Sequence, residues 1–582
     1  MDKNELNQTK GITNIVSKES SNKQRDIIES VLTIVGVIAF AFIVSLICKK
    51  ATVVESEPEL TIGTNDAEIK LYNADYDGAI SLYDLSKENE EWPMYKVKEA
   101  EAYSLKGDCT YSNRLLSDAY DKRNELIRKD GISKYEEQDI ELGKLMIFTA
   151  LMNGEKEKAL QYGEIFLLDE GENEEIYKTM FTVYLANGKR DKAQQILGDL
   201  NYDSNSATDL SQVAYMNMII GDYDKGISYL KAAYEVNKDE VKIYDVIRDV
   251  MKYQGDKLKK KLKSLSKDNE NEECYDVFLA KCYSLDGSKL EEAQKILDKF
   301  NEHNLPCKII QADIYKHLGQ VDKYNELIEK IIEDEKDNYY GKYIKAQYAL
   351  ENRNYDEAIE YAKKSIIDNR DYISTYYNLM PELLLSKKQS EKSESYIRTA
   401  LYKEPFNYNV LVNLADYFNN IRKVSDRALK YYDLAVAIDA DNSDVYYEMA
   451  IAKIALKKKD EAENLLNEAI EKNEGQAKYY RKLANLYLDN KNGDKAIKTI
   501  RKAYDINDKD INTLNDAGYY YMSVGEIDRA ITNFKAAFAG INDSTDITVR
   551  DIITKNYEKA KQYLANKNLW TKSAIDDFKY LD

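Results

Sequence analysis

Small residues return at a fixed interval through most of the chain, each a few positions after a short polar stretch. Ala462, Ala496 and Ala530 are separated by steps of 34 residues, and each lies among apolar residues at helical spacing. The same residue recurs earlier, at Ala159, Ala193, Ala293, Ala358 and Ala428. A small residue that returns every 34 positions after a turn predicts tandem helical hairpins. We therefore expect an all-α solenoid over residues 65–540, in which each hairpin contacts only its neighbours.

The residues between these alanines follow one pattern, which is most complete in residues 477–508. A large residue, a small residue and an aromatic stand at fixed offsets in the first helix, and two small residues stand seven apart in the second. These residues are Tyr480, Leu483, Ala484, Tyr487, Ala496, Ile500 and Ala503. The pattern resembles the tetratricopeptide repeat. The resemblance implies a right-handed superhelical solenoid of about fourteen helix-turn-helix repeats, with protein or peptide partners bound on its concave side.

Three places depart from the regular pattern. Lys260 stands where a small residue belongs, so its unit is degenerate. Pro381 falls in a first helix, where it is expected to kink or shorten that helix. The interval before Ala159 is too long for one repeat, and Ser133 with Glu136 predicts a capping box that starts a long first helix there.

The residues after the last repeat are expected to close the solenoid. We predict two capping helices within residues 541–582, at 548–564 and 571–581. A terminal repeat has to cover its apolar face, and Trp570 and Phe578 are suited to do so.

The resemblance also identifies candidate binding residues near the end of the solenoid. By the repeat register, first-helix side chains facing the concave side are Lys478, Arg481, Asn485, Leu488, Asn515, Asp516, Tyr519 and Met522. Arg481 and Asn485 occupy places that some family members use to clamp a peptide carboxylate. Asp516 stands where that clamp needs a neutral amide, so the clamp is incomplete. Alternatives are a groove of other specificity and a solvated face on which Arg481 pairs with Asp516.

An uncharged run of 18 residues, 31–48, stands near the start of the chain. With Ile27 and Ile28 it reaches the length needed to cross a bilayer. We therefore predict a polar, unordered tail at residues 1–26, a transmembrane helix at 27–48 and a linker at 49–64. A cleaved signal peptide and a lipidated Cys48 are the alternatives. Lysines and arginines are denser before the run than after it, which favours a single-pass protein with an exported repeat domain.

Charge narrows the classes of partner. The formal net charge is −19, and this acidity argues against general nucleic-acid binding, which needs a basic surface. The densest basic run lies in the degenerate unit and comprises Lys257, Lys259, Lys260, Lys261 and Lys263. It is either an anchor for an acidic polymer or lipid headgroups, or the solvated side of a helix whose Leu258 and Leu262 pack inward.

The sequence holds no recognised catalytic motif and no set of residues spaced as metal ligands. We therefore expect no enzyme activity, metal or cofactor. The function predicted from the sequence is a membrane-anchored scaffold that binds a protein or peptide. An accessory subunit of a cell-envelope assembly or secretion machine is the alternative, and an enzyme acting on envelope glycan is a remote one. The sequence does not indicate an oligomeric state.

Overall fold

The computed structural model describes residues 60–86, 91–171, 173–269, 272–299, 304–542, 545–567 and 570–581. The chain divides into two units, Met1–Thr61 and Ile62–Asp582, and all of the described helices belong to the second. Every regular element among the described residues is a helix, which confirms the all-α prediction. No helix within those ranges is long and apolar enough to cross a membrane. The predicted tail and membrane span, residues 1–48, lie outside the described residues.

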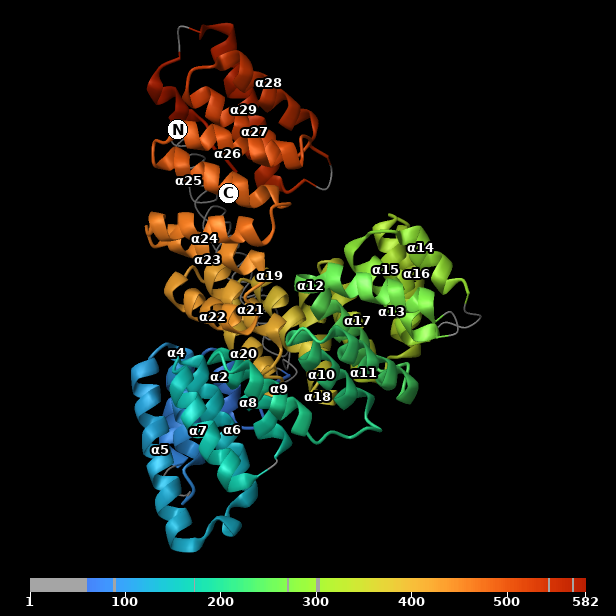
Figure 1. The fold of residues 1–582 in the computed structure, drawn as a ribbon, viewed down its shortest axis with the longest axis vertical. Helices are drawn as coiled ribbons and strands as arrows, with labels where there is room; N and C mark the ends of the chain where they lie inside the picture. The colour runs from blue at the N-terminus through green and yellow to red at the C-terminus, as the bar shows by residue number, and fades with distance from the viewer. Residues whose placement is uncertain are drawn as a thin grey trace, which may run out of the picture. The chain divides into compact units, whose positions relative to one another are not determined.

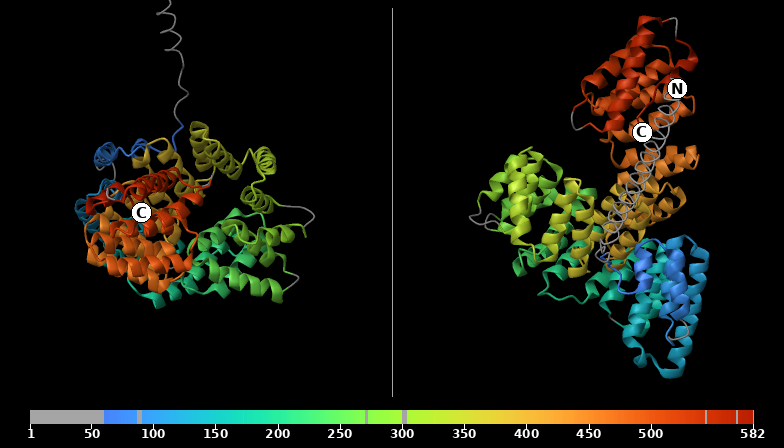
Figure 2. Two further views of the ribbon diagram at one scale, coloured as in Figure 1. Left: turned by 90° about the horizontal axis from the view of Figure 1, so that it is seen from above. Right: turned by 180° about the vertical axis from the view of Figure 1, so that it is seen from behind.

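The described helices pair in chain order into fourteen hairpins, each stacked on the next (Figures 1 and 2). The first helices are α2 (Asp66–Tyr72), α4 (Met94–Lys106), α6 (Glu136–Met152), α8 (Glu174–Ala186), α10 (Ala207–Ile219), the first half of α12 (Val241–Asp268), α13 (Glu273–Asp286), α15 (Leu305–His317), α17 (Tyr339–Glu351), α19 (Met380–Ser386), α21 (Tyr408–Asp416), α23 (Ser443–Ala455), α25 (Ala477–Asp489) and α27 (Ile511–Ser523). The second helices are α3 (Tyr76–Ser86), α5 (Cys109–Asp130), α7 (Lys156–Glu170), α9 (Arg190–Asp199), α11 (Tyr223–Val236), the second half of α12, α14 (Leu290–Leu297), α16 (Val321–Asp334), α18 (Tyr355–Asp368), α20 (Ser393–Lys403), α22 (Ser425–Ile438), α24 (Lys459–Lys472), α26 (Gly493–Ile506) and α28 (Ile527–Ala539).

The turn inside a hairpin is built in the same way in most units. One residue there has a positive φ, which lets the chain leave the first helix and reverse. Glycine takes this place at Gly188, Gly221 and Gly525, and lysine at Lys457 and Lys491. From Gly287 to Gly525 neighbouring turns of this kind lie 32–35 positions apart, so they repeat with nearly the same period as the alanines.

The alanines lie in the seam between the two helices of a hairpin. Ala462, Ala496 and Ala530 are at most 1% exposed, which confirms the repeat register. In the last hairpin a methyl group at Gly518 would lie 2.7 Å from the Phe534 ring, so even one extra carbon has no room. Small residues therefore set how closely the paired helices approach.

We expect Ala496→Leu to destabilise the protein by roughly 1–3 kcal/mol, because added methylenes overpack a filled seam. Lys498→Leu, two positions away on the exposed side of α26, should stay within about 0.5 kcal/mol. Urea unfolding of both variants measures the difference. Equal midpoints would contradict the seam position of Ala496.

The irregular places in the sequence have different structural outcomes. The degenerate unit forms one continuous element, α12, which is interrupted at a non-helical Gln254 with φ −133° and ψ 25°. Before Pro381 the chain forms a π-helical turn, Thr375–Leu379, which accommodates the lost amide donor. The predicted capping box is wrong. Ser133 lies in a 3₁₀ turn, α6 has no side-chain cap, and much of the extra length is in the 22-residue α5.

The first helices together form one side of the stack, which we call the inner surface. From α4 to α12 this surface packs against α20–α22, which lie far away in the sequence. The contacts run along its length: Arg398 Nη2 lies 2.6 Å from Glu101 Oε2, and the Phe148 and Tyr402 rings meet at 5.3 Å. The expectation that each hairpin contacts only its neighbours is therefore wrong, because the solenoid packs against itself.

The end of the chain differs from the prediction in its second half. The first predicted closing helix is present as α29 (Ile547–Ala565). The second is wrong: the chain forms a 3₁₀ turn, Lys572–Asp577, and then runs without helix through residues 578–581, which we call the closing segment. Phe578 stacks on Phe534 at 5.5 Å, and Trp570 Nε1 donates to the Met522 carbonyl at 3.1 Å. These two aromatics cover the last repeat as expected.

Candidate functional site

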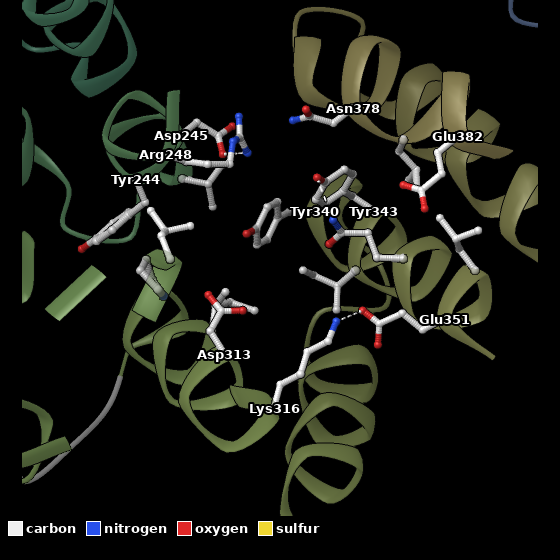
Figure 3. Close-up of a pocket in the computed structure, with 18 of the residues that line it drawn as sticks. Tyr244, Asp245, Arg248, Asp313, Lys316, Tyr340, Tyr343, Glu351, Asn378 and Glu382 are labelled. Carbon is white, nitrogen blue, oxygen red and sulfur yellow. Dashed lines mark hydrogen bonds and ion pairs between the residues drawn. The ribbon is translucent and has the colours of Figure 1, made fainter. Parts of the chain in front are cut away.

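The inner surface is open from α12 to α19, where it forms a hollow of about 650 Å³. We call this the central hollow (Figure 3). Five successive first helices supply most of its lining, so it is a product of the repeat stacking rather than of one motif. Its main lining residues are Tyr244, Asp245, Arg248, Lys281, Asp313, Lys316, Tyr340, Tyr343, Gln347, Glu351, Arg353, Asn378 and Glu382.

Tyrosines form a wall of the central hollow. Tyr340 and Tyr343 stack at 5.7 Å, and both rings lie against Tyr372, at 5.8 and 5.3 Å. Burial raises the pKa of Tyr340 well above its ordinary value, so its hydroxyl stays neutral. This hydroxyl faces the hollow and bonds to no other described residue. Such a wall offers both an apolar face and a hydrogen-bonding group.

Arg248 is fixed at the edge of this wall by several partners. Its Nη1 lies 2.6 Å from Asp245 Oδ1, and its Nη2 donates to Ser374 Oγ at 3.1 Å and to the Tyr377 hydroxyl at 2.9 Å. Because all three partners are buried, the guanidinium is held rigidly. The arrangement ties α12 to the π-helical turn before α19.

The rim of the central hollow carries balanced charge. Lys281 Nζ lies 2.9 Å from Asp313 Oδ2, and Lys316 Nζ lies 2.6 Å from Glu351 Oε1. Glu382 lies on the facing helix α19 (Figure 3). Opposite signs interspersed in this way suit a partner with mixed polar groups rather than a polyanion. In the described ranges no three histidine, cysteine or acidic side chains are grouped as metal ligands.

The binding residues predicted near the end of the solenoid lie together, but they are covered. Asn485, Asn515 and Asp516 are at most 3% exposed because the closing segment lies over them. Asp516 Oδ1 accepts from Leu581 N at 2.7 Å, and Asn515 Nδ2 donates to the Lys579 carbonyl at 3.2 Å. The expectation that they form an open concave face is therefore wrong, and their role in binding a partner stays a prediction.

Arg481 lies beside this cluster, with Nη1 3.9 Å from Asp516 Oδ2 and Nε 3.6 Å from Asp510 Oδ2. These distances match the alternative in which Arg481 pairs with nearby acids. Burial raises the pKa of Asp516 to about 6, while Arg481 and the Leu581 amide act in the opposite direction. Asp516 is therefore a carboxylate near neutral pH and accepts the Leu581 amide in that form.

The other four residues predicted to lie on the concave face differ in their contacts and in their burial. Lys478 Nζ lies 2.5 Å from Asp444 Oδ1, and Leu488 is half-buried on α25. Tyr519 meets Tyr580 of the closing segment edge-on at 5.3 Å, and Met522 is fully buried. Met522 was expected to face a partner and instead belongs to the core.

The basic run on α12 lies on the solvated side of a helix whose leucines pack inward, as one of the two interpretations predicted. Leu258 and Leu262 are fully buried. Lys259 Nζ lies 2.5 Å from Asp286 Oδ2 and Lys261 Nζ lies 2.7 Å from Asp224 Oδ2, so neighbouring hairpins partly neutralise the run. Lys257, Lys260 and Lys263 are exposed. Binding of an acidic polymer or lipid by these lysines stays a prediction.

Comparison with known proteins agrees with the repeat geometry. Two models of the tetratricopeptide repeat match residues 425–486 and 477–510. A TPR repeat-containing protein of Methanocaldococcus jannaschii is 22% identical over 443 residues, which cover 63% of this chain and 76% of the relative. Residues 425–510 are therefore tetratricopeptide repeats.

Solved structures with helical repeats also resemble this chain. The APC/C hetero-tetramer Cut9–Hcn1 is 14% identical over 84% of this chain and 96% of its own, with a TM-score of 0.40. Yeast Tom70 is 16% identical over 88% of this chain and 96% of its own, with a TM-score of 0.32.

The central hollow was not found from the sequence. The sequence feature that could have indicated it is the group of three tyrosines, Tyr339, Tyr340 and Tyr343, at the start of α17. This helix lies three hairpins after the one that contains Arg248. The tetratricopeptide repeat register places such residues on the inner surface, but it does not indicate which part of that surface stays open.

Proposed function

We propose that the protein is an interaction scaffold that binds a polypeptide segment in the central hollow and catalyses no reaction. The observation that supports this most directly is the hollow itself. Its volume of about 650 Å³ lies within the range of ligand pockets, roughly 300–1,000 Å³. It accommodates a few side chains of a partner rather than a folded domain.

The lining favours one kind of segment. An aromatic or aliphatic side chain would pack on the Tyr340–Tyr343 stack, and polar groups beside it would meet the Tyr340 hydroxyl and the carboxylate of Glu382. The balanced rim charge gives orientation rather than strong attraction. The neighbouring part of the inner surface, from α4 to α12, packs against α20–α22 and is covered there.

Photo-crosslinking from two positions tests this proposal. We expect a photoreactive residue at Glu382, which lines the hollow, to capture a partner in native membranes. The same residue at Glu360, exposed on the second helix α18, should not capture it. Tyr340→Phe, which removes the hydroxyl and keeps the ring stack, should reduce capture from position 382 severalfold without changing the melting temperature. Equal capture from both positions would contradict a binding role for the hollow.

We also propose that residues 27–48 anchor the scaffold in a cell membrane as a single helix, with the repeat domain on the extracytoplasmic side. The uncharged run and the lysines and arginines that precede it support this arrangement. The full chain should stay with membranes in a carbonate wash and need detergent for release. Release by carbonate would contradict a spanning helix, and protease protection of the repeats in intact cells would contradict their export.

A further inference from the structure

Polar side chains of the groove bond to the backbone of the closing segment. Asn556 of α29 accepts from Lys579 N at 3.1 Å and donates to the Lys579 carbonyl at 2.6 Å. Asp516 accepts from Leu581 N at 2.7 Å, and Asn485 donates to the Leu581 carbonyl at 3.3 Å. Because both polar groups of alternate residues are satisfied in this way, the groove between α25, α27 and α29 recognises an extended main chain.

Two side chains of the segment fill apolar places in the same groove. Phe578 is 4% exposed and packs on Phe534 and Tyr563. Leu581 is also 4% exposed and joins the apolar cluster that contains Ile553. Lys579 between them is exposed. The groove therefore selects large apolar side chains three positions apart and tolerates the residue after the first of them.

The segment is tethered by a 3₁₀ turn that contacts α29 through one side chain. Asp576 of this turn is exposed, whereas Asp577 Oδ2 accepts from the Tyr563 hydroxyl at 2.7 Å and lies 3.2 Å from Lys559 Nζ. Helix α29 has its own contacts with α28, including the Phe538–Tyr557 stack at 5.0 Å, and its Ala560 is fully buried. The segment can therefore leave the groove while α29 stays in place.

We propose that the groove formed by α25, α27 and α29 is a second polypeptide-binding site, and that the closing segment is its internal ligand. The ligand class is an extended peptide with a large apolar side chain at each of two positions three apart, as in Phe578 and Leu581. A partner segment of this class binds when it displaces the closing segment. The site is separate from the central hollow, so its failure leaves the proposed function standing.

Binding of a labelled peptide to the full chain tests the proposal. The probe is a fluorescent peptide with the sequence of residues 575–582. Leu581→Asp in the protein should release the closing segment, because it loses the apolar place and puts a carboxylate beside Asp516. We expect this variant to bind the probe at least tenfold more tightly than the unmodified chain does. Lys579→Ala, which changes only an exposed side chain, should behave like the unmodified chain.

Two further variants connect the binding to the groove. Asn556→Ala in the Leu581→Asp background should weaken probe binding at least tenfold, because both bonds to residue 579 are lost. A probe that carries aspartate in place of Leu581 should not bind. No binding to the Leu581→Asp chain with unchanged helicity, or equal binding to the unmodified chain, would overturn the proposal.

Hydrogen exchange on the unmodified chain gives a test that needs no substitution. If the closing segment leaves by itself, the Lys579 and Leu581 amides should exchange at least tenfold faster than the Ile553 and Ala560 amides of α29. Excess unlabelled probe peptide should speed exchange at Leu581 further. Equal exchange rates in the segment and in α29 would show that the segment opens only with the helix, and would overturn its role as a ligand.

Discussion

Glu101→Ala should destabilise the protein by roughly 3–5 kcal/mol, because it leaves the Arg398 guanidinium buried without its counter-ion. Arg398 is 2% exposed, and its Nη2 lies 2.6 Å from Glu101 Oε2. Its Nη1 donates to neutral Ser104 Oγ at 3.0 Å, and the nearby carboxylate of Glu394 is already paired with Arg427, so neither offsets the lost charge. Chemical unfolding of the full chain in detergent measures the effect.

Two controls separate the buried charge from a general effect of losing an ion pair. Lys106→Ala breaks an exposed pair with Asp77 and should change the free energy of unfolding far less than Glu101→Ala does. Glu101→Leu combined with Arg398→Met removes both charges and should recover most of the stability. A loss of less than about 0.5 kcal/mol in Glu101→Ala would show that α20 does not depend on this contact with α4.

The second large effect is a dependence of stability on pH. Burial raises the pKa of Asp416 to about 7; Glu448 and Asp444 add to the rise, while the Tyr432 hydroxyl and Lys252 oppose it. The folded state therefore holds this proton more tightly than the unfolded chain, in which an aspartate titrates near 4. Stability from this group is greatest below about pH 4 and falls as the pH rises towards 7.

Asp416→Asn should remove this dependence, because the amide stays neutral and still accepts from the Tyr432 hydroxyl, which lies 2.6 Å from Asp416 Oδ1. Asp416 is half-buried, so we expect the variant to gain on the order of 2 kcal/mol at pH 8 and nothing at pH 4. Melting curves at both values measure the gain. A variant that is equally stable to the parent at pH 8 would contradict the raised pKa.

The repeat architecture could be predicted from the sequence because the residues that produce it lie within each hairpin. An alanine in the seam and a positive-φ turn residue are needed in each hairpin, so Ala462 and Lys457 carry the signal within a few positions. Helices near irregular places were predicted less well. Ser133 failed as a cap because the chain there forms a 3₁₀ turn, and α6 begins after it.

The candidate site could not be predicted because it depends on contacts between distant parts of the chain. The register placed Asn515 and Asp516 on the inner surface correctly, but nothing near them shows that residues 578–581 cover them. The central hollow is open because α20–α22 pack elsewhere, against α4 to α12. Periodicity identifies which side of each helix faces inward. It does not indicate which distant segment of the chain packs against that side.

The packing of α20–α22 against early hairpins has a consequence for synthesis. The Tyr72 hydroxyl bonds to Thr399 Oγ1 across 327 positions, and Arg427 reaches the Ser104 carbonyl across 323. At about 5–20 residues per second, a ribosome needs roughly 15–65 s to make the later partner. During that time the early hairpins have formed helices, but their inner surface is not yet covered by α20–α22. We expect the nascent chain to be a client of chaperones until about residue 440 has emerged, and truncated products that end before α20 to aggregate.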